Sequence, residues 1–166
     1  MVSEKVAQLA DALAAYHPRF GILWRLGVET GLRVSDLLQL QPCDLKHLLH
    51  VVERKTGKIR KIDLSPEIRA VIREYVKDYA LRKGDFLFWS RRGVYHKPMS
   101  RQWAHRVIRR EALSLGFTAI GTHSMRKTFA VDKFRRIRSL EAVQRVLNHT
   151  HVSTTLLYLQ DLLADA

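Results

Sequence analysis

The chain has 166 residues, enough for one globular domain with its own core, and 46% of them are hydrophobic. That composition argues against a disordered chain, and no apolar run is long enough to cross a membrane. Lys and Arg number 29 against 16 Asp and Glu, a net charge of +13 that attracts polyanions such as DNA, RNA or an anionic membrane.

The first part of the chain is expected to be helical. Capping residues and apolar spacing predict helices over residues 3–16, 18–29 and 35–40, with Ser35 as the expected cap of the third. Gly31 ends the second of these helices and Pro42 the third. None of the expected helices combines a basic face with a clean apolar face, which argues against a membrane surface as the polyanion.

A small sheet is expected next. Residues 48–54 and 58–64 are β-like runs on either side of Thr56-Gly57, which is a hairpin signal. Residues 86–89 form a further short apolar run. The sequence therefore predicts a three-stranded antiparallel sheet.

The remainder is again expected to be helical. Ser65 and Ser100 are N-cap candidates for helices that start at residues 66 and 101, and the second of these ends near Leu115. Further helices are expected over about 123–135, 139–148 and 152–157. The predicted fold class is α+β, mainly α-helical. The helix after Ser65 has apolar residues at helical spacing, at Ile68, Val71, Ile72, Tyr75 and Tyr79.

Five short polar segments stand out in chain order. Taken alone, a short pattern within them, such as T-G-L-R or H-x-x-R, is weak evidence of a function. Together, in this order and local context, they are a strong signal. They are ETGLRVSDLL at 29–38, RKTGK at 54–58, THSMRKTFA at 122–130, LNH at 147–149 and STTLLY at 153–158.

These segments resemble the catalytic domain of the tyrosine recombinase, or phage integrase, family from about residue 18 to residue 158. The resemblance implies a helical catalytic domain with a small sheet. It also implies a reaction in which a tyrosine attacks a DNA phosphodiester, leaving a 3′-phosphotyrosine and a free 5′-hydroxyl. The partners that it implies are double-stranded DNA and further copies of the chain, in a tetramer on DNA. The implied catalytic residues are Arg33, Lys55, His123, Arg126, His149 and Tyr158, the last as nucleophile.

The chemistry of phosphoryl transfer fits these residue types. Negative charge on the non-bridging oxygens of the transition state needs cationic donors that are already in place. Arg33 and Arg126 suit this task because a guanidinium binds phosphate through two parallel donors. His149 adds a further donor. Asp36 is an acidic position of the same pattern and is expected to support the loop of Arg33.

Two proton transfers complete the expected reaction. The leaving 5′-oxygen needs a proton, for which Lys55 at the hairpin tip is the expected general acid. His123 is placed to manage the proton of the tyrosine, because imidazole titrates near neutral pH. Phenols are weak acids, so Tyr158 needs cationic surroundings to become a useful nucleophile.

Each assignment has a competing interpretation. Lys58 lies in the same hairpin as Lys55, and hairpin lysines commonly protect an edge strand. His151 is an alternative to His149, although the nine-residue spacing to the tyrosine favours His149. Tyr158 is also compatible with an ordinary core aromatic residue.

Several basic and amide side chains are expected to contact DNA. Arg101 and Gln102 open a helix that corresponds to a DNA-contacting helix of the family, and both side chains can form bidentate contacts with bases. Arginines on the outer face of that helix suit phosphate contacts. The expected DNA-binding residues are Lys58, Arg60, Arg101, Gln102, Arg106, Arg110 and Lys127.

The sequence departs from the family pattern without losing a catalytic group. Asn148 stands where glycine is common, Lys127 where histidine is frequent and Met125 where leucine is usual. Only about seventeen residues precede Pro18, too few for the N-terminal DNA-binding domain that the family usually carries. We therefore expect residues 1–166 to form a single catalytic domain.

No metal ion or other cofactor is expected. Cys43, His47 and His50 form a C-x3-H-x2-H pattern that lacks a fourth ligand for zinc. Cys43 is the only cysteine and cannot form an internal disulfide, which fits the reducing cytoplasm of a prokaryotic cell, whether the chain is encoded by the cell or by a phage.

Two other functions are compatible with the same motifs. The first is a regulatory DNA-binding module that has kept the motif but lost turnover, which would bind DNA in a salt-sensitive way and form no covalent adduct. The second is relaxation of supercoiled DNA by the same tyrosine chemistry, as in type IB topoisomerases. A relaxation assay compared with recombination of paired sites distinguishes this second function from strand exchange.

Overall fold

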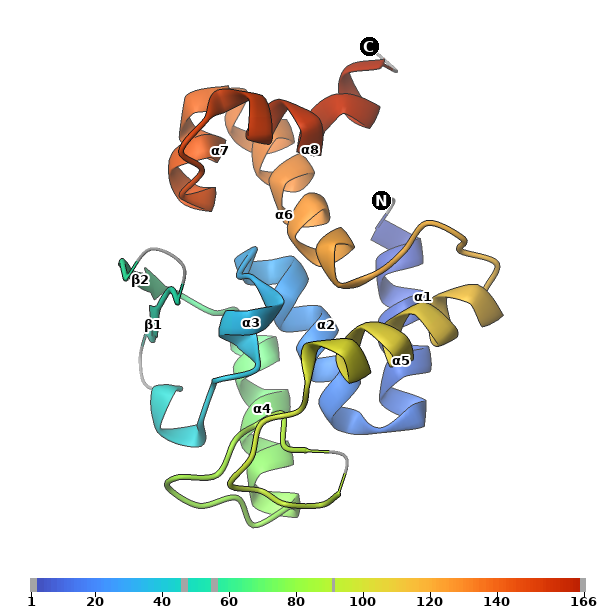
Figure 1. The fold of residues 1–166 in the computed structure, drawn as a ribbon, viewed down its shortest axis with the longest axis vertical. Coiled ribbons are helices and arrows are strands. Elements are labelled where there is room, and N and C mark those ends of the chain that lie inside the picture. The colour runs from blue at the N-terminus through green and yellow to red at the C-terminus, as the bar shows by residue number, and fades with distance from the viewer. Residues whose placement is uncertain (1–2, 46–47, 55–56, 91, 165–166) are drawn as a thin grey trace.

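The computed structural model describes residues 3–45, 48–54, 57–90 and 92–164. The fold is mainly helical with a small antiparallel sheet, which confirms the predicted fold class (Figure 1). Within the described ranges, no helix is both long and apolar enough to cross a membrane. The elements are α1 (Ser3–Tyr16), α2 (Pro18–Thr30), α3 (Val34–Leu37), the 3₁₀ turn η1 (Pro42–Asp44), β1 (Leu49–Val52), β2 (Ile59–Ile62), α4 (Pro66–Asp78), α5 (Arg101–Ser114), α6 (Thr122–Ile137), α7 (Leu140–Leu147) and α8 (Val152–Ala164).

Serine caps start three of the helices. The hydroxyl of Ser65 accepts a hydrogen bond from the backbone N–H of Ile68 at 3.3 Å, and that of Ser100 accepts from Trp103 at 3.1 Å. Ser139 caps α7 in the same way. Each cap satisfies a backbone donor that the first helical turn leaves without a partner. The predicted caps at Ser65 and Ser100 are therefore confirmed.

Helix α3 is shorter than expected. It begins after Arg33, which occupies the N-cap position, so Ser35 lies inside the helix and is not its cap. The backbone N–H groups of Gln39 and Leu40 bond to carbonyls three residues earlier, at 3.2 and 3.1 Å. The chain thus tightens into a 3₁₀-like turn after Leu37 instead of continuing as an α-helix.

The prediction of a third strand at residues 86–89 is wrong. Among the described residues, the sheet contains β1 and β2 alone, paired antiparallel. The N–H of Leu87 donates to the carbonyl of Leu40 at 2.8 Å, away from any partner strand. A single bridge joins Trp89 to Pro98, and proline has no N–H with which to continue a ladder.

The buried residues form two clusters that helix α6 connects. The larger cluster is built from α1, α2, α4, α5 and neighbouring loops, and its last member is Met125 near the start of α6. Figure 1 shows α7 and α8 gathered at one end of the molecule, with α6 running from them to α2. The smaller cluster contains Phe129, Ala130, Val131, Val143, Leu147 and Leu159. Segments that are far apart in the chain meet at the junction between the two clusters.

Gly31 ends α2 in a conformation that only glycine adopts cheaply. Its φ is +62°, and a Cβ there would collide with the ring of Phe129 on α6. We expect Gly31→Ala to lower the free energy of unfolding by about 2–4 kcal/mol, measured by urea denaturation. Gly116 is the matched control, because its φ is +79° and a Cβ there would meet nothing within 4 Å. Gly116→Ala should cost about 1 kcal/mol from backbone strain alone, and equal losses in the two variants would contradict the proposed collision.

His17 gives the fold a pH-dependent helix cap. Its Nδ1 accepts a hydrogen bond from the backbone N–H of Arg19 at 3.3 Å at the start of α2. Burial, and secondarily the charge of Arg19, lowers the pKa of His17 from 6.5 to about 4. The unfolded chain therefore binds this proton more readily than the folded one, so stability falls as the pH drops from 6.5 towards 4.

Replacing this histidine by a cap that does not titrate should remove that part of the pH dependence. Asn also accepts at an N-cap, and we expect His17→Asn to show a smaller decrease in Tm between pH 7 and pH 5 than the unchanged protein. Thermal melts at the two pH values measure it. The same decrease in both proteins would argue against His17 as the source.

Candidate active site

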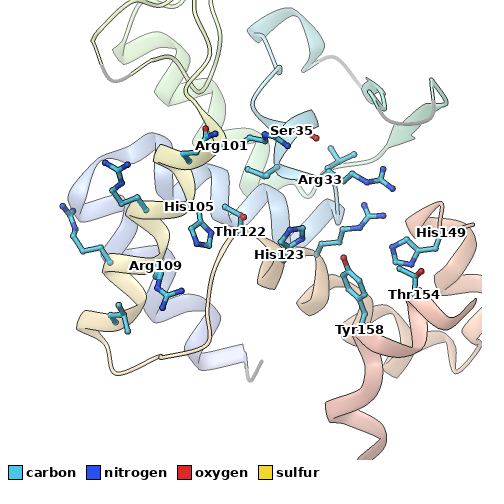
Figure 2. Close-up of a pocket in the computed structure, with 17 residues that line it drawn as sticks. Arg33, Ser35, Arg101, His105, Arg109, Thr122, His123, His149, Thr154 and Tyr158 are labelled. Atoms are coloured by element: carbon cyan, nitrogen blue, oxygen red, sulfur yellow. The ribbon is translucent and has the colours of Figure 1, made fainter. Parts of the chain in front are cut away.

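One open cavity of about 1010 Å³ collects the catalytic residues predicted from the sequence that the structure describes. Its lining includes Arg33, His123, Arg126, His149 and Tyr158. These five residues come from the loop before α3, the first turns of α6, the loop before α8 and α8 itself. Figure 2 shows the labelled members of this set facing a common space. Two guanidiniums, two imidazoles and a phenol thus share one basic, open pocket.

Arg33 is held by a buried acid. Its Nη1 donates to Oε2 of Glu53 at 2.7 Å, and its side chain is 23% exposed while that of Glu53 is fully buried. Nearby, the buried Asp36 accepts a hydrogen bond from the backbone N–H of Arg54 at 3.2 Å. The two acids thus connect the start of α3 to the hairpin, and the contact of Asp36 agrees with its expected supporting role.

Sequence reasoning missed Glu53. The residue also lies 3.6 Å from the guanidinium of Arg60, through Oε1 and Nη1. A signal for it exists in the sequence, because Leu49, Val51 and Glu53 alternate with exposed residues and share the buried face of β1 and its extension. A carboxylate at an inward position of a basic chain needs cationic partners.

Arg126 is the more buried of the two catalytic arginines, with 3% of its surface exposed. Its Nη1 donates to the carbonyl of Gly31 at 2.6 Å, and its Nη2 donates to the carbonyl of Leu147. Burial, and secondarily the charge of Arg33, lowers the pKa of Arg126 to about 10, so the group is still cationic at neutral pH. These bonds join the end of α2 and the end of α7 at one guanidinium.

His149 and Tyr158 are neighbours in the cavity. Their ring centroids lie 5.2 Å apart, and His149 Nδ1 is 3.0 Å from the hydroxyl of Thr155, which is fully buried. In Figure 2 the Tyr158 ring lies between His149 and the exposed His123 of α6. A hydroxyl that orients one imidazole, next to a phenol, is an arrangement suited to proton transfer and to binding an anion.

One wall of the same cavity comes from α5. It contains the four α5 residues that the sequence predicted to contact DNA, namely Arg101, Gln102, Arg106 and Arg110. Arg110 is also engaged by Glu111, which accepts from its Nε at 2.8 Å. The wall further contains Arg109, one of the arginines expected to contact phosphate, and His105 and Leu113, which the sequence prediction of DNA-binding residues left out.

Three expected DNA-binding residues lie away from this cavity. Arg60 is directed inward, donating to the carbonyl of Thr30 at 3.0 Å as well as facing Glu53, and burial lowers its pKa. Lys58 donates to the side-chain oxygen of Asn148 at 3.0 Å. The third is Lys127 on α6. The guanidinium of Arg60 is therefore engaged inside the fold, and its expected contact with DNA stays a prediction.

Two residues singled out in the sequence lie outside the described residues. They are Lys55, the expected general acid, and His47 of the cysteine–histidine pattern. Among the neighbouring described residues, the N–H of Glu53 donates to the carbonyl of Lys58 at 2.9 Å.

Comparison with known sequences identifies close relatives. "Probable integrase/recombinase YoeC" of Bacillus subtilis (strain 168) is 36% identical over 158 residues, covering 94% of this chain and 85% of YoeC. Tyrosine recombinase XerD of Staphylococcus saprophyticus is 34% identical over 139 residues, covering 78% of this chain and 45% of XerD. The chain therefore spans most of YoeC but less than half of the Xer protein.

Solved structures share the fold. The XerA recombinase superposes with a TM-score of 0.80 at 24% identity, covering 95% of this chain and 58% of that one. A lambda integrase tetramer bound to a Holliday junction gives a TM-score of 0.72 at 21% identity, covering 93% of this chain and 47% of the integrase chain. The model of the phage integrase family matches residues 1–163. The resemblance inferred from five short motifs thus extends over nearly the whole chain, which belongs to the phage integrase family.

Proposed function

We propose that this protein cuts and rejoins DNA strands as a site-specific recombinase, with Tyr158 as the covalent nucleophile. One observation carries the proposal: two arginines, two histidines and a tyrosine from separate segments line a single open cavity. The names of relatives such as XerD and YoeC support the same activity. In this proposal residues 1–166 act as a single catalytic domain.

The proposed reaction is a transesterification at phosphorus. The phenolic oxygen of Tyr158 forms a bond to phosphorus while the bond to the 5′-oxygen breaks, and the protein keeps a 3′-phosphotyrosine. His123 takes up the phenolic proton, and Lys55 supplies a proton to the leaving 5′-oxygen. Attack of a 5′-hydroxyl on the phosphotyrosine reverses these steps, so rejoining needs no ATP.

The cationic groups stabilise the negative charge of the phosphate in this proposal. Arg33, Arg126 and His149 bind the non-bridging oxygens, whose negative charge persists in the transition state. The guanidiniums are held by Glu53, by Gly31 and by Leu147, so they need little rearrangement when DNA binds.

The substrate is double-stranded DNA, and the reaction takes place in the cytoplasm. The α5 wall contributes Arg101, Gln102 and Arg106 to the cavity, and these side-chain types suit contacts with DNA phosphates and base edges. Strand exchange requires two DNA sites, hence several copies of the chain. The tetrameric lambda integrase on a Holliday junction is the precedent for four.

A suicide-substrate experiment tests the proposal. The protein is incubated with a library of nicked duplexes of randomised sequence, in which cleavage next to the nick releases a short fragment and prevents rejoining. We expect protein–DNA adducts that survive denaturation, and mass spectrometry of the digested protein should place the DNA on the peptide containing Tyr158. Sequencing the attached DNA identifies the preferred site.

The absence of an adduct and its presence each lead to a distinct conclusion. Salt-sensitive DNA binding without any adduct would contradict the proposed chemistry and favour a binding module that does not cleave DNA. If an adduct forms, relaxation of a supercoiled plasmid is compared with recombination between two selected sites. Relaxation without recombination would replace strand exchange by a topoisomerase-like activity.

A further inference from the structure

Asn148 connects the histidine loop to the hairpin through both ends of its amide. Its Nδ2 donates to Oε2 of Glu53 at 3.0 Å, and its Oδ1 accepts from Nζ of Lys58 at 3.0 Å. Glu53 directly follows β1 and Lys58 directly precedes β2, so one side chain contacts both arms of the hairpin. The residue after Asn148 is His149, which lines the cavity.

Glu53 carries this connection on to Arg33. The same carboxylate oxygen, Oε2, that accepts from Asn148 also accepts from Nη1 of Arg33 at 2.7 Å. A continuous path thus runs from Arg33 through Glu53 and Asn148 to the backbone of His149. Its two ends are groups that face one cavity and, under the proposed function, one phosphate.

The other side of this loop is also anchored. The N–H of His149 donates to the carbonyl of Gln144 at 3.1 Å, and the Gln144 amide donates back to the carbonyl of His149 at 3.1 Å. The carbonyl of Leu147 accepts from Arg126. Three consecutive residues, 147–149, therefore contact Arg126, the hairpin and the cavity in turn.

Asparagine fits this position for two physical reasons. The backbone has φ +53°, a left-handed conformation that Asn tolerates better than most residues other than glycine. Its amide provides a donor for a carboxylate and an acceptor for an ammonium at once. Glycine shares the backbone freedom but has no side chain, and aspartate would place a second carboxylate against Glu53.

We propose that Asn148 is a positioning residue: through Glu53 it holds Arg33 at the distance from His149 at which both side chains bind the scissile phosphate. The inference rests on the proposed function. Because Asn148 shares the carboxylate oxygen with Arg33, its N–H weakens the hold of Glu53 on that guanidinium. Without it, Glu53 binds the Arg33 guanidinium more strongly at the same short distance, and Arg33 is less available to the phosphate.

Asn148→Gly tests the proposal in single-turnover cleavage of the suicide duplex selected by adduct formation. We expect the cleavage rate to fall about ten-fold, the size of effect for one charge-assisted hydrogen bond, with DNA affinity unchanged. Asn148→Asp should lose at least as much. Ala80→Gly, at an exposed residue that also has positive φ, is the backbone control and should cleave at the unchanged rate.

A substrate with an uncharged phosphate separates positioning from general damage. Replacing a non-bridging oxygen by a methyl group removes the charge that Arg33 would stabilise. We therefore expect Asn148→Gly and the unchanged protein to differ by less than about two-fold on this methylphosphonate, since the residue's effect requires that charge. An equal ten-fold deficit on both substrates would overturn the proposal, because it would indicate a merely structural role.

Two further outcomes would also overturn it. The first is an unchanged rate in both Asn148 variants. The second is rescue on a 5′-bridging phosphorothiolate instead, whose thiolate leaves without a proton, because that would place the effect at the leaving group. Failure of the unchanged protein to cleave any duplex would instead contradict the proposed function itself, so the two failures are distinguishable.

Discussion

Tyr158→Phe should abolish the covalent adduct while leaving the protein folded. Loss of a nucleophile that forms a covalent intermediate lowers turnover by about four orders of magnitude or more. The ring itself is retained, so its contact with His149 and its packing against the smaller core cluster persist. We therefore expect a change in the free energy of unfolding within about 0.5 kcal/mol. Adduct yield on the suicide duplex and urea denaturation measure the two quantities.

The control for this variant is the same chemical change elsewhere. Tyr79 is a partly buried tyrosine that packs against Tyr75 and His17 and does not belong to the lining of the cavity. Tyr79→Phe should form adducts as the unchanged protein does. If Tyr158→Phe still formed adducts at a comparable rate, another side chain would have to be the nucleophile and the assignment would be wrong.

Arg126→Lys should slow cleavage by about 10²–10³-fold although the charge is kept. A lysine ammonium has no planar fork, so it cannot hold the carbonyls of Gly31 and Leu147 and also present donors to a phosphate. Loss of those buried bonds should also lower the free energy of unfolding by about 1–3 kcal/mol. Cleavage is therefore measured well below the Tm of the variant, where the protein is fully folded.

Arg136 provides a matched control on the same helix. It is exposed and pairs with Asp132 one turn away, at 3.1 Å. Arg136→Lys keeps the charge at the surface, and we expect stability and cleavage rate to stay close to those of the unchanged protein. Cleavage by Arg126→Lys within ten-fold of the unchanged protein would contradict a role for the guanidinium fork.

The local features of the fold were predictable from sequence. Ser65 and Ser100 cap their helices as expected, because a cap involves a side chain and a backbone group only three residues away. Gly31 ends α2 for the same local reason. The third strand was mispredicted because a strand needs a partner, and the apolar pattern of residues 86–89 does not reveal that Leu87 bonds to Leu40.

The candidate site was only partly predictable. Motif order and residue chemistry picked out Arg33, Arg126 and Tyr158, which the structure brings to one cavity. The inward position of Arg60 was missed, because a surface arginine and a buried one look alike until the neighbouring acid is known. The role of Lys55 stays a prediction, since it lies outside the described residues.

The sequence by itself determined the family, the helical class and the residue types able to handle a phosphodiester, since these depend on local spacing and on side-chain chemistry. Tertiary structure alone decided how the groups are held. Glu53 meets Arg33 from 20 residues away and Asn148 from 95 residues away. Such pairings follow from the packing of distant segments around a buried charge, and that packing is a property of the whole fold.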